Sequence, residues 1–364
     1  MTIYFLIVFG LYFFLLTTLM LGWNRVFSHQ PNRNSSGKFI SVVIAVRNEG
    51  RNIRWLIGSL LEQQYPASGF EIIVVNDHST DNTLEVLQPM ASSAQNFSIL
   101  SLTENEAGKK EALAKGILNA RGKIIATTDA DCQLPPDWLI KIDQVFSDEQ
   151  CQMAVGLVSL QQQNLFSKLQ SLEFAGVMGV TFGTLGWRIP TMCNGANLAF
   201  WKSTFEQVNG YAGNEHIASG DDEFLMRKIQ ARFPGSVVAL NSLVVTQPQA
   251  SARDFFRQRI RWAGKWKVNS SFFAKSLAVF IWLFQASWVM LWVSAGLLSV
   301  KYFLTFLLSK IIIDLIFLLT VANRLNTAFN FFIFLLLQLV YPFYVFSVGI
   351  LSWWKKVEWK GRKI

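Results

Sequence analysis

The sequence is poor in cysteine and histidine. Among its 364 residues it has three cysteines and no CxxC pair, which argues against a disulfide framework and fits a reducing compartment. These cysteines are Cys132, Cys151 and Cys193. The histidines are too few and too scattered to predict a histidine metal site: His29, His78 and His216.

Charged residues are also scarce. They make up 16% of the chain, whereas soluble proteins usually carry about 25%. Hydrophobic residues reach 51% and the mean hydropathy is +0.30, so we expect part of the chain to lie in lipid. The net charge of +9 suits anionic lipid or an anionic substrate. No zinc-finger or RNA-binding signature is present, so nucleic acid is not an expected partner.

The first long apolar segment, Ile3–Trp23, has 21 uncharged residues. At about 1.5 Å per residue it would cross a hydrocarbon core of roughly 30 Å. It lacks the basic start and small-residue cleavage site of a secretory signal, so we predict a transmembrane helix over residues 1–23. Three basic residues follow, Arg25, Arg33 and Lys38. The positive-inside rule then places residues 38–250 in the cytosol, under the plasma (inner) membrane.

The chain turns apolar again from about residue 274. About three transmembrane helices are predicted within 274–352, at Ser276–Val300, Tyr302–Val321 and Ala328–Leu351. Lys310 and Asp314 interrupt the second of them and share a helix face, because they are four residues apart. Two interpretations remain open: the two charges neutralise each other, or they contact a polar acceptor.

The basic tail, residues 353–364, creates a conflict of topology. One span before residues 38–250 and three after them would place the tail outside the cell. The positive-inside rule prefers it inside, since it holds Lys355, Lys356, Lys360, Arg362 and Lys363. Either one carboxyl-terminal segment is re-entrant or the charge rule fails here.

Short apolar runs alternate with helical patterns in residues 38–250. Strands are predicted at Phe39–Val46, Glu71–Val75 and Ile124–Thr128, with helices near 50–64, 79–90 and 108–120. This alternation predicts an α/β domain on a mostly parallel sheet with helices on both faces. Ligands of such sheets bind at the carboxyl ends of the strands, so the residues after each strand are the candidate site.

Two acids follow the strand at 124–128. Asp129 and Asp131 form an Asp-x-Asp motif. Two carboxylates at the carboxyl end of a strand suit a hard cation, Mg²⁺ or Mn²⁺, which also binds diphosphate oxygens. Alternatively, Asp129 and Asp131 lie in an ordinary solvated loop and bind no metal.

Polar residues follow the other strands as well. Asp77 could accept hydrogen bonds from a ribose or base, although this segment also begins a helix. Arg47 and Glu49 follow the first strand, which ends near Ala45. Lys109 and Lys110 open another helix and could meet phosphate charge there; lysines of a solvated turn are the alternative.

Three further motifs follow later in the chain. Asn194–Phe200 reads as a glycine turn entering a strand, and Ser219–Leu225 as a helix start with paired acids, Asp221 and Asp222. Acids at a helix start are commonly caps, yet a transferase also needs a base for its acceptor hydroxyl. An interfacial segment is expected over 251–273, with arginines and tryptophan in the run Gln258, Arg259, Arg261 and Trp262.

In this order, from about Phe39 to Trp262, the motifs resemble glycosyltransferase family 2, and within it the membrane synthases of chitin, hyaluronan and related polymers. The resemblance implies a GT-A fold, an α/β Rossmann-like nucleotide-diphospho-sugar transferase domain. The sequence departs from the family at Ala45, where proline is usual, at Asn76–Ser79, where Asp-Asp-Gly-Ser is usual, and at Asp221, where glutamate is usual. These departures bear on which donor is recognised rather than on the type of reaction.

The resemblance also implies roles for individual residues. Asp222 matches the proposed catalytic base, and Asp129 and Asp131 match the metal site. Donor binding is implied for Ala45, Arg47, Glu49, Asp77, Lys109, Lys110 and Asp129. A place near the acceptor or the diphosphate is implied for Asp221, Gln258, Arg259, Arg261 and Trp262.

The expected activity is inverting transfer of a hexosyl or N-acetylhexosaminyl group. The donor is a nucleotide-diphosphate sugar, expected to be a UDP-sugar, and the acceptor is a membrane-associated glycan or lipid in polysaccharide or lipid-linked glycan synthesis. Single-sugar transfer to a membrane lipid is one alternative. A non-catalytic nucleotide-sugar-binding scaffold is another, against which Asp222 argues, because a binder needs no base.

Overall fold

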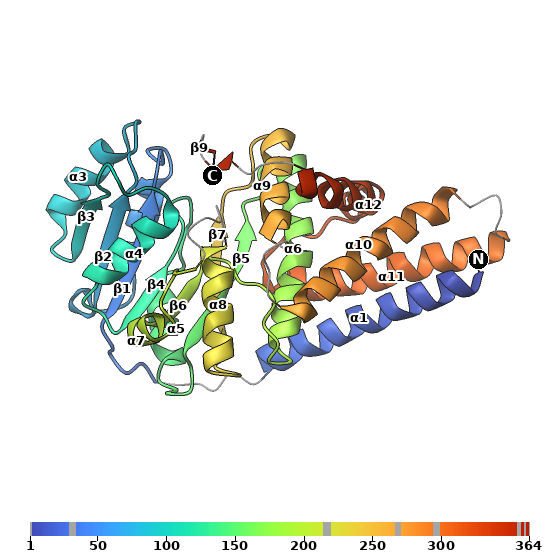
Figure 1. Cartoon of the computed structure of the whole chain (residues 1–364), viewed down its shortest axis with the longest axis horizontal. Coiled ribbons are helices and arrows are strands. Elements are labelled where there is room, and N and C mark those ends of the chain that lie inside the picture. Colours follow the sequence, from blue (N-terminus) through green and yellow to red (C-terminus); the bar gives the residue numbers. More distant parts are fainter. Residues whose placement is uncertain are drawn as a thin grey trace.

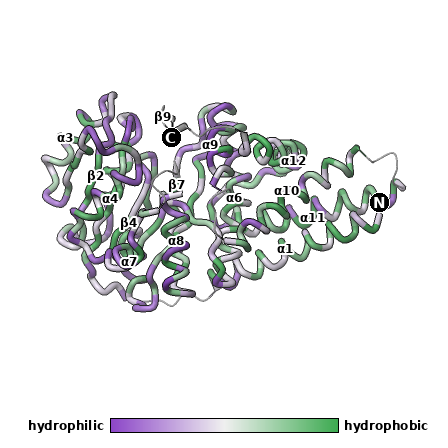
Figure 2. Tube along the Cα trace, viewed as in Figure 1, coloured by the Kyte–Doolittle hydropathy of each residue, from purple (hydrophilic) through white to green (hydrophobic). Residues whose placement is uncertain are grey.

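An α/β domain and a group of long apolar helices make up the two halves of the molecule (Figure 1). The computed structural model describes residues 2–28, 34–213, 220–265, 271–293, 299–354, 358–359 and 362–363. Hydrophobic residues dominate the helical half, whereas hydrophilic residues concentrate on the α/β domain (Figure 2). Arg33, Ser219 and the tail lysines Lys355, Lys356 and Lys360 lie outside the described residues.

A seven-stranded sheet with the order β3-β2-β1-β4-β6-β5-β7 forms the core of the α/β domain. Its first four strands run parallel; β1, β2 and β4 are apolar and buried on both faces, whereas the edge strand β3 is only partly buried. The strands are β1 Ile40–Val46, β2 Phe70–Asn76, β3 Phe97–Ser101, β4 Ile124–Thr127, β5 Met153–Leu160, β6 Leu198–Trp201 and β7 Val237–Thr246.

The sheet is mixed, because β6 runs antiparallel to both β4 and β5. After β5 the chain leaves the sheet as α6 (Leu165–Leu185) and returns at the carboxyl end of β4. Here Thr127 Oγ1 donates a hydrogen bond to Gly195 O at 3.1 Å. A strand that enters at that end must run against β4, which periodicity alone does not reveal.

Helices connect and cover the strands of the α/β domain. α4 packs on β1 and β2 so closely that a Cβ at Gly116 would lie 2.4 Å from Val43. α8 begins after Gly220, whose φ of +91° favours glycine. The helices of this half are α2 Ile53–Leu61, α3 Thr83–Ser93, α4 Lys109–Asn119, α5 Trp138–Val145, α7 Lys202–Gln207, α8 Asp221–Arg232 and α9 Ala252–Gly264.

Among the described residues, four helices are long and apolar enough to cross a membrane, as judged by length and composition. They are α1 Thr2–Ser28, α10 Phe272–Val293, α11 Val300–Arg324 and α12 Phe331–Trp354. In Figure 1, α1, α10 and α11 run along the long axis of the molecule, whereas α6 crosses them and α12 is strongly foreshortened. The short strand β9 (Arg362–Lys363), beyond α12, lies toward the α/β domain (Figure 1).

Lys310 and Asp314 belong to a buried polar cluster among the apolar helices. Lys310 Nζ lies 2.7 Å from Asp314 Oδ2, and Tyr12 of α1 donates to Asp314 Oδ1 at 2.7 Å. Gln338 of α12 donates to Asp314 Oδ2 at 2.9 Å. The two charges therefore neutralise each other, which limits the cost of burying them and ties α1, α11 and α12 together.

A clamp on Asp143 fixes the segment between α1 and β1. The Asp143 carboxylate, buried in α5, accepts hydrogen bonds from the Ser36 hydroxyl at 2.7 Å and the Gly37 amide at 2.7 Å. Ser35 Oγ and the Lys38 amide donate to it as well. These donors hold the pKa of Asp143 below its usual value, although burial alone would raise it.

The crossing of α1 and α6 joins the two halves. A Cβ at Gly22 would lie only 2.0 Å from the Gly183 carbonyl oxygen, so the two backbones are in direct contact. Trp187 Nε1 donates to Thr18 O at 2.9 Å beside this crossing. Small residues at such crossings allow close packing of apolar helices.

We expect Gly22→Ala to lower the stability of the protein in detergent by about 1–3 kcal/mol, because the added methyl would force two backbones apart. Gly10→Ala in the same helix is the matched control, since no atom lies within 4 Å of its added Cβ. Thermal unfolding of the two variants would measure the difference. Equal midpoints for both would contradict the importance of the crossing.

Candidate active site

Parallel register brings the ends of three strands to one edge of the sheet. Val46 pairs with Asn76 across β1 and β2, and Val43 pairs with Thr127 across β1 and β4. The residues that follow these strands, Arg47, Asp77 and Asp129, are therefore neighbours although they are far apart in the chain. This is the edge at which parallel sheets bind ligands.

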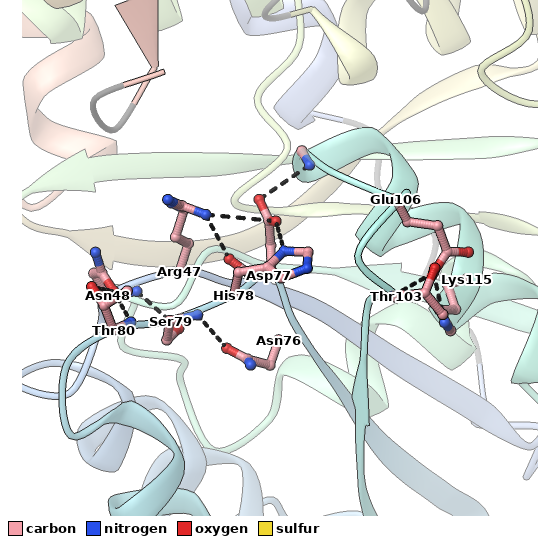
Figure 3. A network of polar contacts seen from close by, with 11 residues as sticks. Arg47, Asn48, Asn76, Asp77, His78, Ser79, Thr80, Thr103, Glu106 and Lys115 are labelled. Atoms are coloured by element: carbon pink, nitrogen blue, oxygen red, sulfur yellow. Dashed lines mark hydrogen bonds and ion pairs between the residues drawn. The ribbon is translucent and has the colours of Figure 1, made fainter.

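Asp77 organises the first part of this edge (Figure 3). Its carboxylate accepts a hydrogen bond from the Gly108 amide at 3.1 Å and lies 2.9 Å from His78 Nδ1. Arg47 donates to the Asp77 carbonyl at 2.9 Å. Asp77 is only 1% exposed, so in this structure it holds neighbouring groups in place beneath the surface.

The loops after β1 and β2 are bound to each other. Asn48 and His78 both have left-handed backbones, with φ of +54° and +53°. The Asn48 amide donates to Ser79 Oγ at 3.0 Å, and the Thr80 amide donates to Asn48 Oδ1 at 2.8 Å (Figure 3). His78 therefore acts as a turn residue, and the paired loops form a fixed border of the site.

Lys109, the first residue of α4, lies among acids. Its Nζ is 2.6 Å from Asp129 Oδ1 and 3.8 Å from Asp221 Oδ2. Burial acts to lower the pKa of Lys109, but Asp129, Asp221 and Asp222 outweigh it and hold this pKa above its usual value. The lysine is therefore a stable cation at the centre of the acidic edge.

Asp222 lies at the amino terminus of α8 with both carboxylate oxygens engaged. Oδ1 accepts from the Glu223 amide at 2.7 Å, and Oδ2 accepts from the Gly195 amide at 2.9 Å. Lys265 Nζ, at the end of α9, lies 3.8 Å from Oδ1. Burial acts to raise the pKa of Asp222, but Lys265, Lys109 and the two amides outweigh it, so the carboxylate is ionised near neutral pH.

α9 carries the basic and aromatic run. Arg259 is buried and forms an ion pair with Glu173 of α6. Burial lowers the pKa of Arg261, an effect that the acids Asp221, Asp129 and Asp222 oppose from across the site. The two arginines therefore differ: the charge of Arg259 is paired within the protein, whereas Arg261 faces the acidic edge.

These elements enclose one cavity of about 830 Å³. One face of α6, at helical spacing, gives it an apolar wall of Phe174, Val177 and Met178, ending at Thr181. Twelve of the residues singled out from the sequence line the cavity: Ala45, Arg47, Glu49, Lys109, Asp129, Asp131, Asp221, Asp222, Gln258, Arg259, Arg261 and Trp262. Asp77 and Lys110 are not among the lining residues.

The carboxylates suit a divalent cation only together with further ligands. Within the described ranges, no three His, Cys, Asp or Glu side chains are placed to hold a metal by themselves. Burial and the neighbouring Asp129 and Glu49 carboxylates raise the pKa of Asp131 to about 6, a crowding that a cation would relieve. Mg²⁺ is often held by one or two carboxylates plus substrate phosphates and water, and Asp129 with Asp131 fits that pattern.

Two charged residues that support this site, Glu173 and Lys265, were not singled out from the sequence. Glu173 is a lone acid in the apolar stretch of α6, which is itself a signal, because a buried charge requires a partner. Lys265 follows Trp262 by three residues and so shares its helix face. Gly195 was recognised as a turn residue, but the bond from its amide to Asp222 could not be read from the sequence.

Comparisons with known proteins agree with this geometry. Residues 41–215 match the family model described as "Glycosyl transferase family 2". The glycosyltransferase AglE of Haloferax volcanii is 23% identical over 259 residues, which are 67% of this chain and 80% of AglE. A poly-β-1,6-N-acetyl-D-glucosamine synthase of Staphylococcus epidermidis is 26% identical over 264 residues, 70% of this chain and 62% of that protein.

A solved structure supports the fold over nearly the whole length. The mannosyltransferase PcManGT of Pyrobaculum calidifontis, solved with GDP-Man and Mn²⁺, superposes with a TM-score of 0.56 at 18% identity. The superposition covers 97% of this chain and 99% of that one. On the family match, the relatives and this fold, residues 41–215 form a glycosyltransferase family 2 domain with a GT-A fold, and in the described part of the chain this domain is joined to four long apolar helices.

Proposed function

We propose that the cavity transfers a sugar from a nucleotide-diphosphate donor to an acceptor held at the membrane. The observation that carries the proposal is that an ionised carboxylate, Asp222, and the Asp129–Asp131 pair line one cavity with an apolar wall. The acids and cations suit a diphosphate sugar. The apolar wall on α6 suits an acceptor with a lipid portion, because the opposite side of α6 packs on α1 and α11.

In this proposal Asp222 is the catalytic base. It takes the proton from the acceptor hydroxyl as that oxygen bonds to the anomeric carbon of the donor sugar. The bond from this carbon to the diphosphate oxygen breaks, and the leaving diphosphate takes the electron pair. Attack opposite the leaving group inverts the anomeric centre.

The remaining residues bind and orient the donor. Arg261 and Lys109 face the position of the diphosphate, where fixed cations stabilise developing negative charge. Asp129 and Asp131 would hold Mg²⁺ or Mn²⁺, and the bound ion would neutralise charge on the leaving group. Asp77 lies beneath the cavity wall and holds Arg47 and the start of α4 in place through hydrogen bonds. A UDP-sugar with a hexosyl or N-acetylhexosaminyl group is the proposed donor.

We place the α/β domain in the cytosol and the chain in the plasma membrane as a multi-pass protein. Arg25 and Lys38 flank the end of α1 that joins the α/β domain, in agreement with the positive-inside rule. Because β9 lies toward the α/β domain, we place Arg362 and Lys363 of this strand on the cytosolic side as well (Figure 1).

Product analysis tests the proposed function. Membranes containing the protein are incubated with labelled UDP-sugars, and label is sought in solvent-extractable lipid and in long polymer. We expect label in a lipid or lipid-linked fraction. Label in long polymer would instead favour a processive synthase, the activity named for the Staphylococcus epidermidis relative. Absence of sugar-dependent release of nucleoside diphosphate with any donor would leave a non-catalytic scaffold.

Replacing Asp222 with Asn should lower kcat about 10²–10⁴-fold, because the acceptor proton loses its base. Donor binding, measured by calorimetry, should change little, since the amide can keep one of the two backbone hydrogen bonds. The control is Asp137→Asn, which removes a half-exposed acid paired with Lys141 on α5. Near-normal turnover in Asp222→Asn would remove this residue as the base.

Replacing Asp129 with Ala should weaken the binding of UDP in the presence of Mn²⁺ by at least about tenfold. Loss of a group that merely orients a metal ligand typically lowers metal affinity about tenfold or more, and loss of the ligand itself should cost at least as much. Binding of UDP without Mn²⁺ should change much less. Calorimetric titrations with and without the metal measure both effects, with Asp137→Ala as control. The metal assignment would be contradicted by an unchanged contribution of Mn²⁺.

A further inference from the structure

A buried ion pair joins α9 to α6. Arg259 Nε donates to Glu173 Oε1 at 3.2 Å, and Arg259 Nη2 donates to Glu173 Oε2 at 2.5 Å. The two parallel bonds fix both position and orientation of the guanidinium. Arg259 is 4% exposed and Glu173 is 7% exposed, so both groups are largely shielded from water and the charge of each is compensated by the other.

Arg259 organises the inner side of α9. Its Nη1 donates to Gln258 Oε1 at 2.6 Å. Its guanidinium also lies 4.6 Å from the ring centre of Phe255 and 4.2 Å from that of Trp262. Desolvated contacts of a guanidinium with aromatic rings are favourable. The orientation of Gln258 and Trp262, both on the cavity wall, therefore depends on Arg259.

A third helix reaches the same carboxylate. Tyr344 of α12 donates to Glu173 Oε1 at 3.2 Å. Its ring packs on Phe255 and Phe256 of α9, at centroid distances of 5.3 and 5.8 Å. Glu173 is thus the common acceptor where α6, α9 and α12 meet.

Helix geometry relates this anchor to the cavity. Residues two apart in an α-helix differ by about 200° around the axis, so Arg259 and Arg261 lie on nearly opposite faces of α9. Fixing Arg259 against Glu173 therefore sets the rotation of α9, and with it the position of Arg261 in the cavity that Asp129 and Asp222 also line.

We propose that Glu173 is a positioning residue for sugar transfer: through Arg259 it sets the rotation of α9 and so aligns Arg261, Gln258 and Trp262 with the donor diphosphate, while Tyr344 extends the same link to α12. The inference rests on the donor site proposed above. It adds that an acid of an apolar helix, outside every motif of the cytosolic domain, controls how the donor is held.

Glu173→Gln keeps the size of the side chain but removes its charge. We expect kcat to fall about 100-fold, the scale of a displacement of about 1 Å, and the binding of UDP with Mn²⁺ to weaken. Tyr344→Phe, which removes one hydrogen bond and keeps the ring packing, should act in the same direction and less strongly. Unchanged turnover and UDP affinity in Glu173→Gln would overturn the proposal.

A double variant separates positioning from stability. In Glu173→Leu/Arg259→Met no buried charge remains unpaired, so thermal stability should return toward that of the parent protein. Turnover and UDP affinity should stay low, because nothing then fixes the rotation of α9. Recovery of both activity and stability would show a merely structural pair and overturn the proposal.

Glu71→Gln is the matched control. Glu71 pairs with Arg121 at 2.8 Å, near the start of β2 and so at the opposite end of this strand from the cavity. The Glu71→Gln variant should have a lower thermal stability than the parent protein but the same affinity for UDP. Because UDP binding is measured without turnover, a failure of Asp222 as base would leave this outcome unchanged, so the two proposals can fail separately.

Discussion

The close contact between α1 and α6 is the constraint on which the arrangement of the molecule depends. The backbones meet at Gly22 and Gly183, which fixes α6 against the apolar helices. The opposite face of α6 forms the apolar wall of the cavity. α6 therefore lies between the apolar helices, where lipid is expected, and the charged cavity. Because α6 contacts both, it fixes the position of the cavity relative to the apolar helices.

Charge inside the cavity is balanced group by group. Lys109 faces Asp129 and Asp221, Lys265 faces Asp222, and each pair joins elements far apart in sequence. Lys265 and Lys109 lower the pKa of Asp222, although burial alone would raise it, so this carboxylate stays ionised. The proposed donor diphosphate and divalent cation would bring charges of both signs, so they could enter without leaving the site strongly unbalanced. The proposed base Asp222 and the charged residues around it thus form one electrostatic unit.

The strands and the residues that follow them could be predicted from the sequence, because they depend on patterns within short segments of the chain. Apolar runs gave the strands β1, β2 and β4, and their shared direction placed Arg47, Asp77 and Asp129 at one edge. The antiparallel β6, the crossing of α6 and the partner of Arg259 were not predicted. Each depends on pairing over long separations, such as the 86 residues between Glu173 and Arg259, for which periodicity carries no information.

The clamp on Asp143 has a consequence for how substrates arrive. The chain is held to α5 from Ser35 onward, only a few residues after α1 ends at Ser28. An extended residue spans at most about 3.6 Å, so this tether gives the α/β domain little reach. The domain cannot swing out to collect an acceptor. The membrane acceptor proposed above would instead have to reach it by diffusing sideways in the bilayer, so the supply of that acceptor in the leaflet would set how often the enzyme meets it.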